Sequence, residues 1–213
     1  MILELNEVEA RIVGCLIEKE LTTPEYYPLT LNALVNACNQ KSNRNPVVNY
    51  DEQTVEASLD ALLKRDIVYL FYGAGSRTKK YKHLLPNLLE LDEAETALLC
   101  VLLLRGAQTH GEINQRTGRM YEFDGLDEID KTITALEKRE EPLVVTLPRQ
   151  PGQKEGRVMH LLSGEIDFEN FDFSQPSGRV NGANAELENR IAALEASVTS
   201  LKEEFAEFKK QFE

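Results

Sequence analysis

The side chains best suited to chemistry in this sequence are amides and cations, and they gather in two short stretches. Asparagines recur every three or four residues between 32 and 43, and four basic residues lie between 77 and 82. Amides beside cations can contact base edges and phosphate oxygens. The sequence therefore predicts a binding surface for double-stranded DNA or another protein, made of Asn36, Asn39, Gln40, Lys41, Asn43, Arg44, Arg77, Lys79, Lys80 and Lys82.

A purely structural role for the same residues stays open. Asparagines also cap helix ends and turns, and lysines keep the edge strand of a sheet soluble. No acidic residue lies from Ile67 to Leu85, a pattern that both a binding role and a solubilising role of the lysines allow.

No arrangement of residues indicates catalysis. His83, His110 and His160 lack Cys, Asp or Glu at metal-ligand spacing, and the three cysteines stand on apolar faces, as small buried hydrophobes do. There is neither a P-loop nor a GxGxxG motif. We therefore expect a protein that is not an enzyme and uses neither a cofactor nor a metal.

The charge balance restricts the partners. With 36 acidic and 24 basic residues the formal charge is −12, which excludes a generally basic nucleic-acid coat. A local basic patch can still bind a partner, because at physiological salt the interactions of exposed charges are largely screened beyond about 8 Å. No apolar run reaches the roughly 18–20 residues that cross a bilayer. The N-terminus has no basic segment typical of a signal peptide, and three unpaired cysteines suit the cytoplasm, where we expect the protein to act without a membrane partner.

An internal repeat organises the chain. The segment 5–12 returns at 91–98, 59–65 returns at 133–139, and His83-Leu84-Leu85 returns as His160-Leu161-Leu162. In each copy apolar spacing predicts three helices, and β-branched or aromatic runs then predict a hairpin. This order is that of a winged helix. The predicted fold is mainly α with small β-hairpins (α+β): winged-helix domains at 1–86 and 87–163.

The third helix of each predicted domain is acidic. In the first copy it carries Asp51, Glu52, Glu56 and Asp60, and basic residues appear only at its end. Acidic side chains that face phosphates oppose binding, so we do not expect either third helix to enter a DNA groove in the usual way.

The remainder of the chain divides into an acidic, aromatic segment with a linker (164–184) and a C-terminal coiled-coil helix (185–213). In this predicted helix successive apolar residues are separated by four and three residues in turn, as they are along the heptad seam of a coiled coil. This pattern favours a homodimer over docking onto the chain's own domains, and leaves parallel and antiparallel pairing open. The seam consists of Leu187, Ile191, Leu194, Val198, Leu201, Phe205, Phe208 and Phe212.

Residues 27–44, YPLTLNALVNACNQKSNR, resemble the signature of the YceH-type family of bacterial proteins, as do residues 99–106 and Leu147-Pro148-Arg149. Asn45 stands where that family usually has an acid. The resemblance spans about 1–163 and implies two tandem winged-helix domains without catalytic residues. The resemblance implies no biochemical function. From the Asn/Lys/Arg surface of the first domain we expect a non-enzymatic, DNA-associated regulator; the alternative is a protein-interaction scaffold that does not bind nucleic acid.

Overall fold

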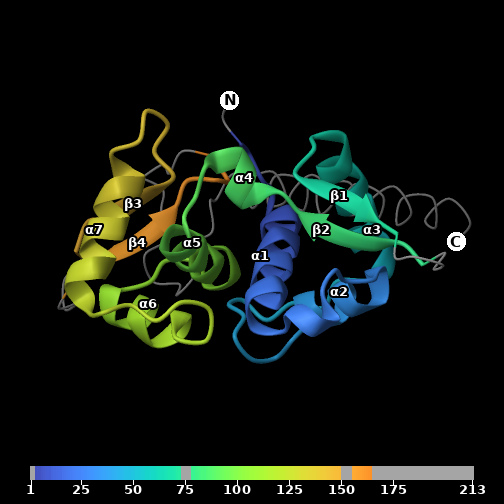
Figure 1. The fold of residues 1–213 in the computed structure, drawn as a ribbon, viewed down its shortest axis with the longest axis horizontal. Helices are drawn as coiled ribbons and strands as arrows, with labels where there is room; N and C mark the ends of the chain where they lie inside the picture. The colour runs from blue at the N-terminus through green and yellow to red at the C-terminus, as the bar shows by residue number, and fades with distance from the viewer. Residues whose placement is uncertain (1–2, 73–77, 150–154, 165–213) are drawn as a thin grey trace, which may run out of the picture. The chain divides into compact units, whose positions relative to one another are not determined.

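The computed structural model describes residues 3–72, 78–149 and 155–164, which belong to one compact unit. Arg77 and all residues of the predicted heptad seam lie outside these ranges, so the coiled coil and the homodimer stay predictions. Within the described residues the chain is mainly helical with two small antiparallel strand pairs, which confirms the α+β class (Figure 1). No helix in this part of the chain is both long and apolar enough to cross a membrane.

The first half of the unit runs to residue 84. Helix α1 (Glu7–Thr22) is followed by a short 3₁₀ turn, η1 (Pro24–Tyr26), and by α2 (Leu31–Cys38) and α3 (Glu52–Lys64). Strands β1 (Val68–Phe71) and β2 (Lys80–His83) then pair antiparallel.

The second half repeats this order after a short linking helix, α4 (Leu85–Leu89), which the sequence pattern did not predict. It consists of α5 (Glu93–Arg105), α6 (His110–Thr117) and α7 (Leu126–Glu137). Strands β3 (Val144–Leu147) and β4 (Arg157–His160) form the second antiparallel pair.

The two halves share strand register as well as element order. His83 lies opposite Val68 in the first strand pair, and His160 lies opposite Val144 in the second. Each second strand also forms a bridge to the residue before the N-cap of the second helix in its half, at 29–81 and at 108–158. The repeat seen in the sequence therefore extends to the backbone pairing of the strands.

Helix caps are repeated too. Asn6 and Glu9 form a capping box at the start of α1, and Asp92 and Glu95 form the same box at the start of α5. In a capping box the two side chains each accept a hydrogen bond from the other residue's backbone N–H, which satisfies two donors that a helix start leaves free. Thr30 and Thr109 cap the second helices of the two halves, where their side chains accept hydrogen bonds from the backbone N–H groups of Ala33 and Glu112.

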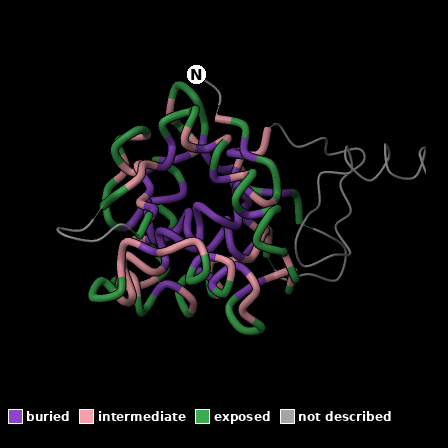
Figure 2. Tube along the Cα trace, turned by 90° about the vertical axis from the view of Figure 1, so that its right-hand side faces the viewer, coloured by how far each residue is buried: buried purple, intermediate pink, exposed green. Residues whose placement is uncertain are grey.

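Helices α1 and α5 pack against each other in the centre of the unit. Every residue from Glu9 to Glu18 and from Ala94 to Leu104 is buried, and in Figure 2 these buried segments fill the middle of the trace. A helix that is covered all round must contact several neighbours, and α1 also packs on α2 and α3. The apolar run 98–104 of α5 is buried throughout.

Gly14 is the point of closest approach between these helices. A Cβ atom added there would lie 2.9 Å from Leu104 Cδ2 and 3.1 Å from Leu103 Cβ, so that the two leucines would have to shift to accept it. The Sγ of Cys100 also contacts the carbonyl oxygen of Gly14, at 3.4 Å. Glycine therefore allows α1 and α5 to pack closely, at the cost of a weaker helix.

We expect Gly14→Ala to lower the free energy of unfolding by about 1 kcal/mol, because overpacking costs about 1–3 kcal/mol and outweighs the helix propensity gained. Gly111→Ala, in α6, is the matched control, since nothing lies within 4 Å of its added Cβ. That variant should be neutral or more stable. Urea unfolding of both variants measures the difference, and equal effects would contradict the close approach at Gly14.

Candidate functional site

Strand β2 and the residue before it present part of the predicted basic surface, which we call the lysine strand (Lys79, Lys80 and Lys82). Lys79 is exposed and Lys80 half-buried, and among the described residues no carboxylate lies within 4.0 Å of either ammonium group. Lys82 differs, because its Nζ lies 3.2 Å from Glu20 Oε1 and 5.9 Å from the centre of the Tyr27 ring. Two lysines of the strand are therefore available to a partner, and the third is engaged with α1 and η1.

A buried histidine fixes the lysine strand to α1. His83 Nε2 lies 2.7 Å from Glu20 Oε2, and the backbone N–H of His83 donates to the hydroxyl of Tyr27 at 3.0 Å. The side-chain hydrogen bond with His83 is the main cause that lowers the pKa of Glu20 below its ordinary value, so this carboxylate stays ionised. The position of β2 is thus set by contacts that do not use Lys79 or Lys80.

The predicted amides have different roles in the structure. Asn36 is exposed on α2, and its Nδ2 donates to Oδ1 of Asn32 at 2.8 Å. Asn39 donates to the carbonyl oxygen of Tyr50 and accepts from its backbone N–H, both at 2.8 Å. Asn36 thus remains part of a surface, whereas Asn39 has the structural role that the alternative reading of the asparagines proposed.

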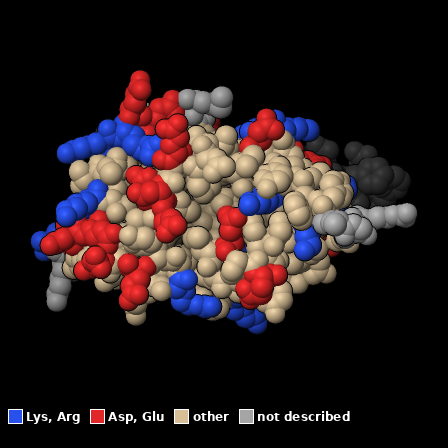
Figure 3. Space-filling view, in the orientation of Figure 1, with Lys and Arg blue, Asp and Glu red and all other residues tan. Residues whose placement is uncertain are grey.

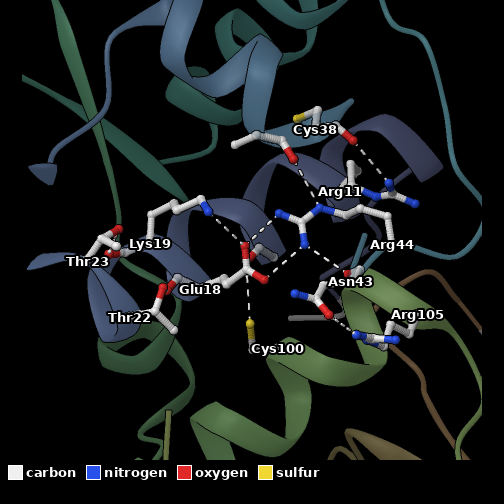
Figure 4. A network of polar contacts seen from close by, with 12 residues as sticks. Arg11, Glu18, Lys19, Thr22, Thr23, Cys38, Asn43, Arg44, Cys100 and Arg105 are labelled. Carbon is white, nitrogen blue, oxygen red and sulfur yellow. Dashed lines mark hydrogen bonds and ion pairs between the residues drawn. The ribbon is translucent and has the colours of Figure 1, made fainter. Parts of the chain in front are cut away.

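Arg44 is a buried residue and does not belong to the candidate surface, contrary to the prediction. Its guanidinium donates to both carboxylate oxygens of Glu18, at 3.0 and 2.6 Å, and also to the carbonyl oxygens of Ala37 and Asn43 (Figure 4). Burial alone would lower the pKa of Arg44, but Glu18 raises it above its ordinary value, so the arginine stays charged. A polar run in the sequence does not reveal that one of its cations turns inward.

Arg11, which was not among the predicted site residues, is a second buried arginine that joins α1 to the same connection as Arg44 does. It is 4% exposed and donates to the carbonyl oxygens of Cys38 and Pro46, at 3.2 and 2.7 Å. Together the two arginines fasten the connection between α2 and α3 (residues 39–51) to α1. This connection carries Gln40, Lys41 and Asn43, and its position is therefore set from inside the fold.

Gln40, Lys41 and Asn43 line a cleft of about 830 Å³, which we call the basic cleft. Its walls are the end of α1, the start of the α2–α3 connection, the end of α5 and the last turn of α6 with the residues after it. Five cations line it, against a single acidic residue, Glu18. The cations are Lys19, Lys41, Arg105, Arg116 and Arg119.

The charges in the basic cleft are poorly compensated. Glu18 is already paired with Arg44, and Lys19 lies 3.4 Å from the same carboxylate. Arg116 has one weak pair with Glu112 at 3.4 Å, and Arg105 donates to the neutral amide oxygen of Asn43. Burial and then the neighbouring charge of Arg116 lower the pKa of Arg105.

Lys41 and Arg119, both exposed, have no carboxylate within 4.0 Å among the described residues. The cleft therefore has a surplus of positive charge in a chain whose formal charge is −12.

Four of the five cations in the cleft were missed by the sequence analysis. Lys19, Arg105, Arg116 and Arg119 are far apart in the chain and meet Lys41 only because α1 packs on α5. One signal was present in the repeat, since the segment after the second helix of each copy is basic, with Lys41 in the first and Arg119 in the second. The repeat alone did not show that these two segments would share one cleft.

The residues considered for nucleophilic or metal chemistry are buried or singly paired. Cys15, Cys38 and Cys100 are buried free thiols, as predicted, and burial raises the pKa of Cys100 well above its ordinary value. His110 Nδ1 lies 2.9 Å from Asp130 Oδ1. Within the described ranges no three His, Cys, Asp or Glu residues are placed to hold a metal ion.

The third helices present acidic faces, as the sequence analysis expected. Asp51, Glu52, Glu56 and Asp60 are all exposed at or along α3. On α7, Asp127 and Asp130 are exposed, and in Figure 3 acidic side chains crowd the part of the surface where Figure 1 places this helix. The described unit therefore separates its charges, with cations at the cleft and the lysine strand and acids on the third helices.

The family model and the relatives that match this chain point to one family. Residues 5–153 match the family described as "Protein of unknown function, DUF480". A "UPF0502 protein" of Opitutus terrae is 52% identical over 191 residues, which cover 89% of this chain and 83% of the relative. A "UPF0502 protein" of Pelobacter propionicus is 50% identical over 98% of both chains. A "UPF0502 protein YceH" of Escherichia fergusonii is 48% identical over 94% of both chains.

Proposed function

The chain belongs to the DUF480 family, and from this premise we propose that it is a non-enzymatic protein, built of two winged-helix units, that associates with duplex DNA. The wing of the first unit contacts the DNA backbone through Lys79 and Lys80.

The element order and pairing support two winged-helix units. Each half has three helices followed by an antiparallel strand pair, and in each the second strand bridges to the residue before the N-cap of the second helix. A winged helix is a helix-turn-helix with such a hairpin added. DNA recognition by helix-turn-helix proteins uses one helix in the major groove and flanking contacts to phosphates.

The observation that carries the DNA proposal is the lack of counter-charges at Lys79 and Lys80. Lys82, two residues further along β2, has Glu20 as its partner, whereas no described carboxylate neutralises the other two. Lysines without partners can replace the counterions of a DNA backbone, which supplies most of non-specific affinity. The exposed amides of Asn32 and Asn36 on α2 add hydrogen-bonding groups in the same half.

Groove insertion by α3 does not fit this surface, because its exposed side chains at 51, 52, 56 and 60 are acidic. Backbone contacts from the wing need no such insertion, and they position a protein without reading sequence. We therefore expect weak sequence preference and a strong dependence of affinity on salt.

The test is the affinity of a labelled duplex for the full chain, measured by fluorescence anisotropy between about 50 and 200 mM salt. Lys79→Glu with Lys80→Glu should weaken binding and lower the slope of log affinity against log salt by about 2, one unit for each lost phosphate contact. The matched control is Lys131→Glu with Lys138→Glu, which makes the same change in net charge at exposed lysines of α7 and its C-cap. This control should bind as the parent chain does.

Absence of duplex binding at low salt would reject the DNA proposal, and so would equal weakening by both charge-reversal variants. In either case the exposed acidic faces of α3 and α7 favour the second candidate, a scaffold for protein partners with basic surfaces. Like-charge repulsion from the same acids would keep such a scaffold away from nucleic acid.

A further inference from the structure

The basic cleft differs from the lysine strand in position and in shape. Glu18 and Thr22, which line the cleft, are four residues apart and share one face of α1. Glu20, which holds Lys82 and His83, lies between them in sequence and therefore on another face. The cleft and the lysine strand are thus separate surfaces on the last turns of α1.

The cleft has the size and the lining of a small-molecule site. Its volume of about 830 Å³ lies within the usual range for ligand pockets, about 300–1,000 Å³. Val101, Leu104 and Met120 supply an apolar part of its lining, and Val101 and Leu104 are almost fully buried. Such a combination of apolar contacts and a few charged groups can hold a ligand body and fix its orientation.

The charged groups select an anion. Arg105, Arg116 and Arg119 bring planar guanidinium groups, which pair well with phosphate oxygens, while Lys41 adds a compact charge. The carboxylate of Glu18 does not compete for these cations, because Arg44 holds both of its oxygens (Figure 4). Lys41, Arg105 and Arg119 have no carboxylate partner among the described residues, and the Arg116–Glu112 pair is weak at 3.4 Å. The repulsion among these cations is relieved by a ligand that carries more than one negative charge.

We propose that the basic cleft binds a small phosphorylated ligand with an apolar or aromatic body, of which a nucleoside triphosphate is the simplest representative. The phosphate chain contacts Lys41, Arg116 and Arg119, and the ligand body lies against Val101, Leu104 and Met120. Because both halves of the unit contribute walls, a bound ligand ties them together and raises the temperature of unfolding. This site is independent of the DNA contact at the lysine strand.

Titration calorimetry of the full chain at low salt, with ATP and with tripolyphosphate as probes, tests the proposal. Both probes should bind, and ATP should bind more tightly because only ATP has a body to cover the apolar lining. Lys41→Glu with Arg119→Glu should weaken ATP binding by roughly tenfold or more, because two charge-assisted contacts become repulsive. Both side chains are exposed and without described partners, so this variant should fold as the parent does.

Lys79→Glu with Lys80→Glu serves as the matched control and should leave ATP affinity unchanged. Duplex affinity distinguishes a small phosphorylated ligand from the DNA backbone as the source of the phosphate. The cleft variant, Lys41→Glu with Arg119→Glu, should bind duplex DNA as the parent chain does. The proposal is overturned if neither probe binds or raises the unfolding temperature, or if both variants weaken ATP binding equally. It is also overturned if the cleft variant loses duplex binding while the parent chain binds no ATP, since the cleft would then serve the DNA backbone.

Discussion

Replacing Arg44 with methionine should lower the free energy of unfolding by about 3–5 kcal/mol, the usual cost of removing one partner from a buried ion pair. The Arg44 side chain is fully buried, and that of Glu18 is 12% exposed. The substitution leaves the Glu18 carboxylate without its two strongest hydrogen bonds. It also leaves the carbonyl oxygens of Ala37 and Asn43 without their donor. Urea unfolding followed by circular dichroism measures the loss.

A double-mutant cycle separates the ion pair from these other contacts. Adding Glu18→Leu to Arg44→Met should recover part of the loss, because the charge left unpaired is removed. The matched control is Lys82→Met, which breaks the pair with Glu20, where both side chains are about one-third exposed. That variant should lose about 1 kcal/mol or less. A similar loss for Arg44→Met and Lys82→Met would show that the Arg44 pair does not stabilise the interior.

The same substitution tests how the cleft is built. Arg44 does not line the cleft, but it holds the connection that places Lys41 and Asn43 there. It is therefore a positioning residue. If the cleft binds ATP as proposed, Arg44→Met should weaken that binding at temperatures where the variant is still folded.

Local sequence signals predicted the elements of this fold well. Apolar spacing predicted three helices in each copy, and β-branched or aromatic runs predicted the hairpin that follows them, as the structure has. The repeat also holds for long-range contacts that were not foreseen, since Arg65 pairs with Glu9 and Arg139 lies 3.7 Å from Glu95 at the matching positions. The helices and strands were predictable because caps and periodicity act within a few residues, whereas these two ion pairs join residues far apart in sequence.

The direction in which a cation points was not predictable in the same way. Lys41 and Arg44 are three residues apart in one polar run, yet one is exposed and the other buried. The difference depends on Glu18, which is 26 residues away in sequence from Arg44 and is brought near it by the packing of α1. The cleft was missed for the same reason, because its cations come from α1, α5 and α6 and meet only in the folded chain.

The two strand histidines show how a repeated position can acquire two environments. His83 and His160 occupy the same register in their strand pairs, which agrees with the repeat of His-Leu-Leu in the sequence. His83 contacts Glu20, but the residue that matches Glu20 in the second copy is Gly106, which has no side chain. His160 is consequently buried without a carboxylate partner among the described residues, and its Nδ1 has no hydrogen bond there.

This difference predicts that His160 makes the protein sensitive to mild acid. Burial lowers the pKa of His160 from 6.5 to about 4. The unfolded chain therefore takes up a proton at this site below about pH 6.5, whereas the folded chain does so only near pH 4. The stability associated with neutral His160 is complete above pH 6.5 and is lost as the pH falls toward 4, by roughly 2 kcal/mol between about pH 7 and pH 5.

His160→Gln removes the titrating group, so the free energy of unfolding of this variant should fall less between pH 7 and pH 5 than that of the parent chain. His110→Gln is the matched control, because His110 is partly exposed and paired with Asp130, and it should keep the parent's acid sensitivity. Carboxyl groups such as Glu18, whose pKa lies below its ordinary value because Arg44 outweighs the effect of burial, lose their contribution only at lower pH. Between pH 5 and 6.5 the difference between the parent chain and His160→Gln therefore reports on His160. Urea unfolding at several pH values decides the matter: parallel curves for the two chains would show that folding does not lower the pKa of His160.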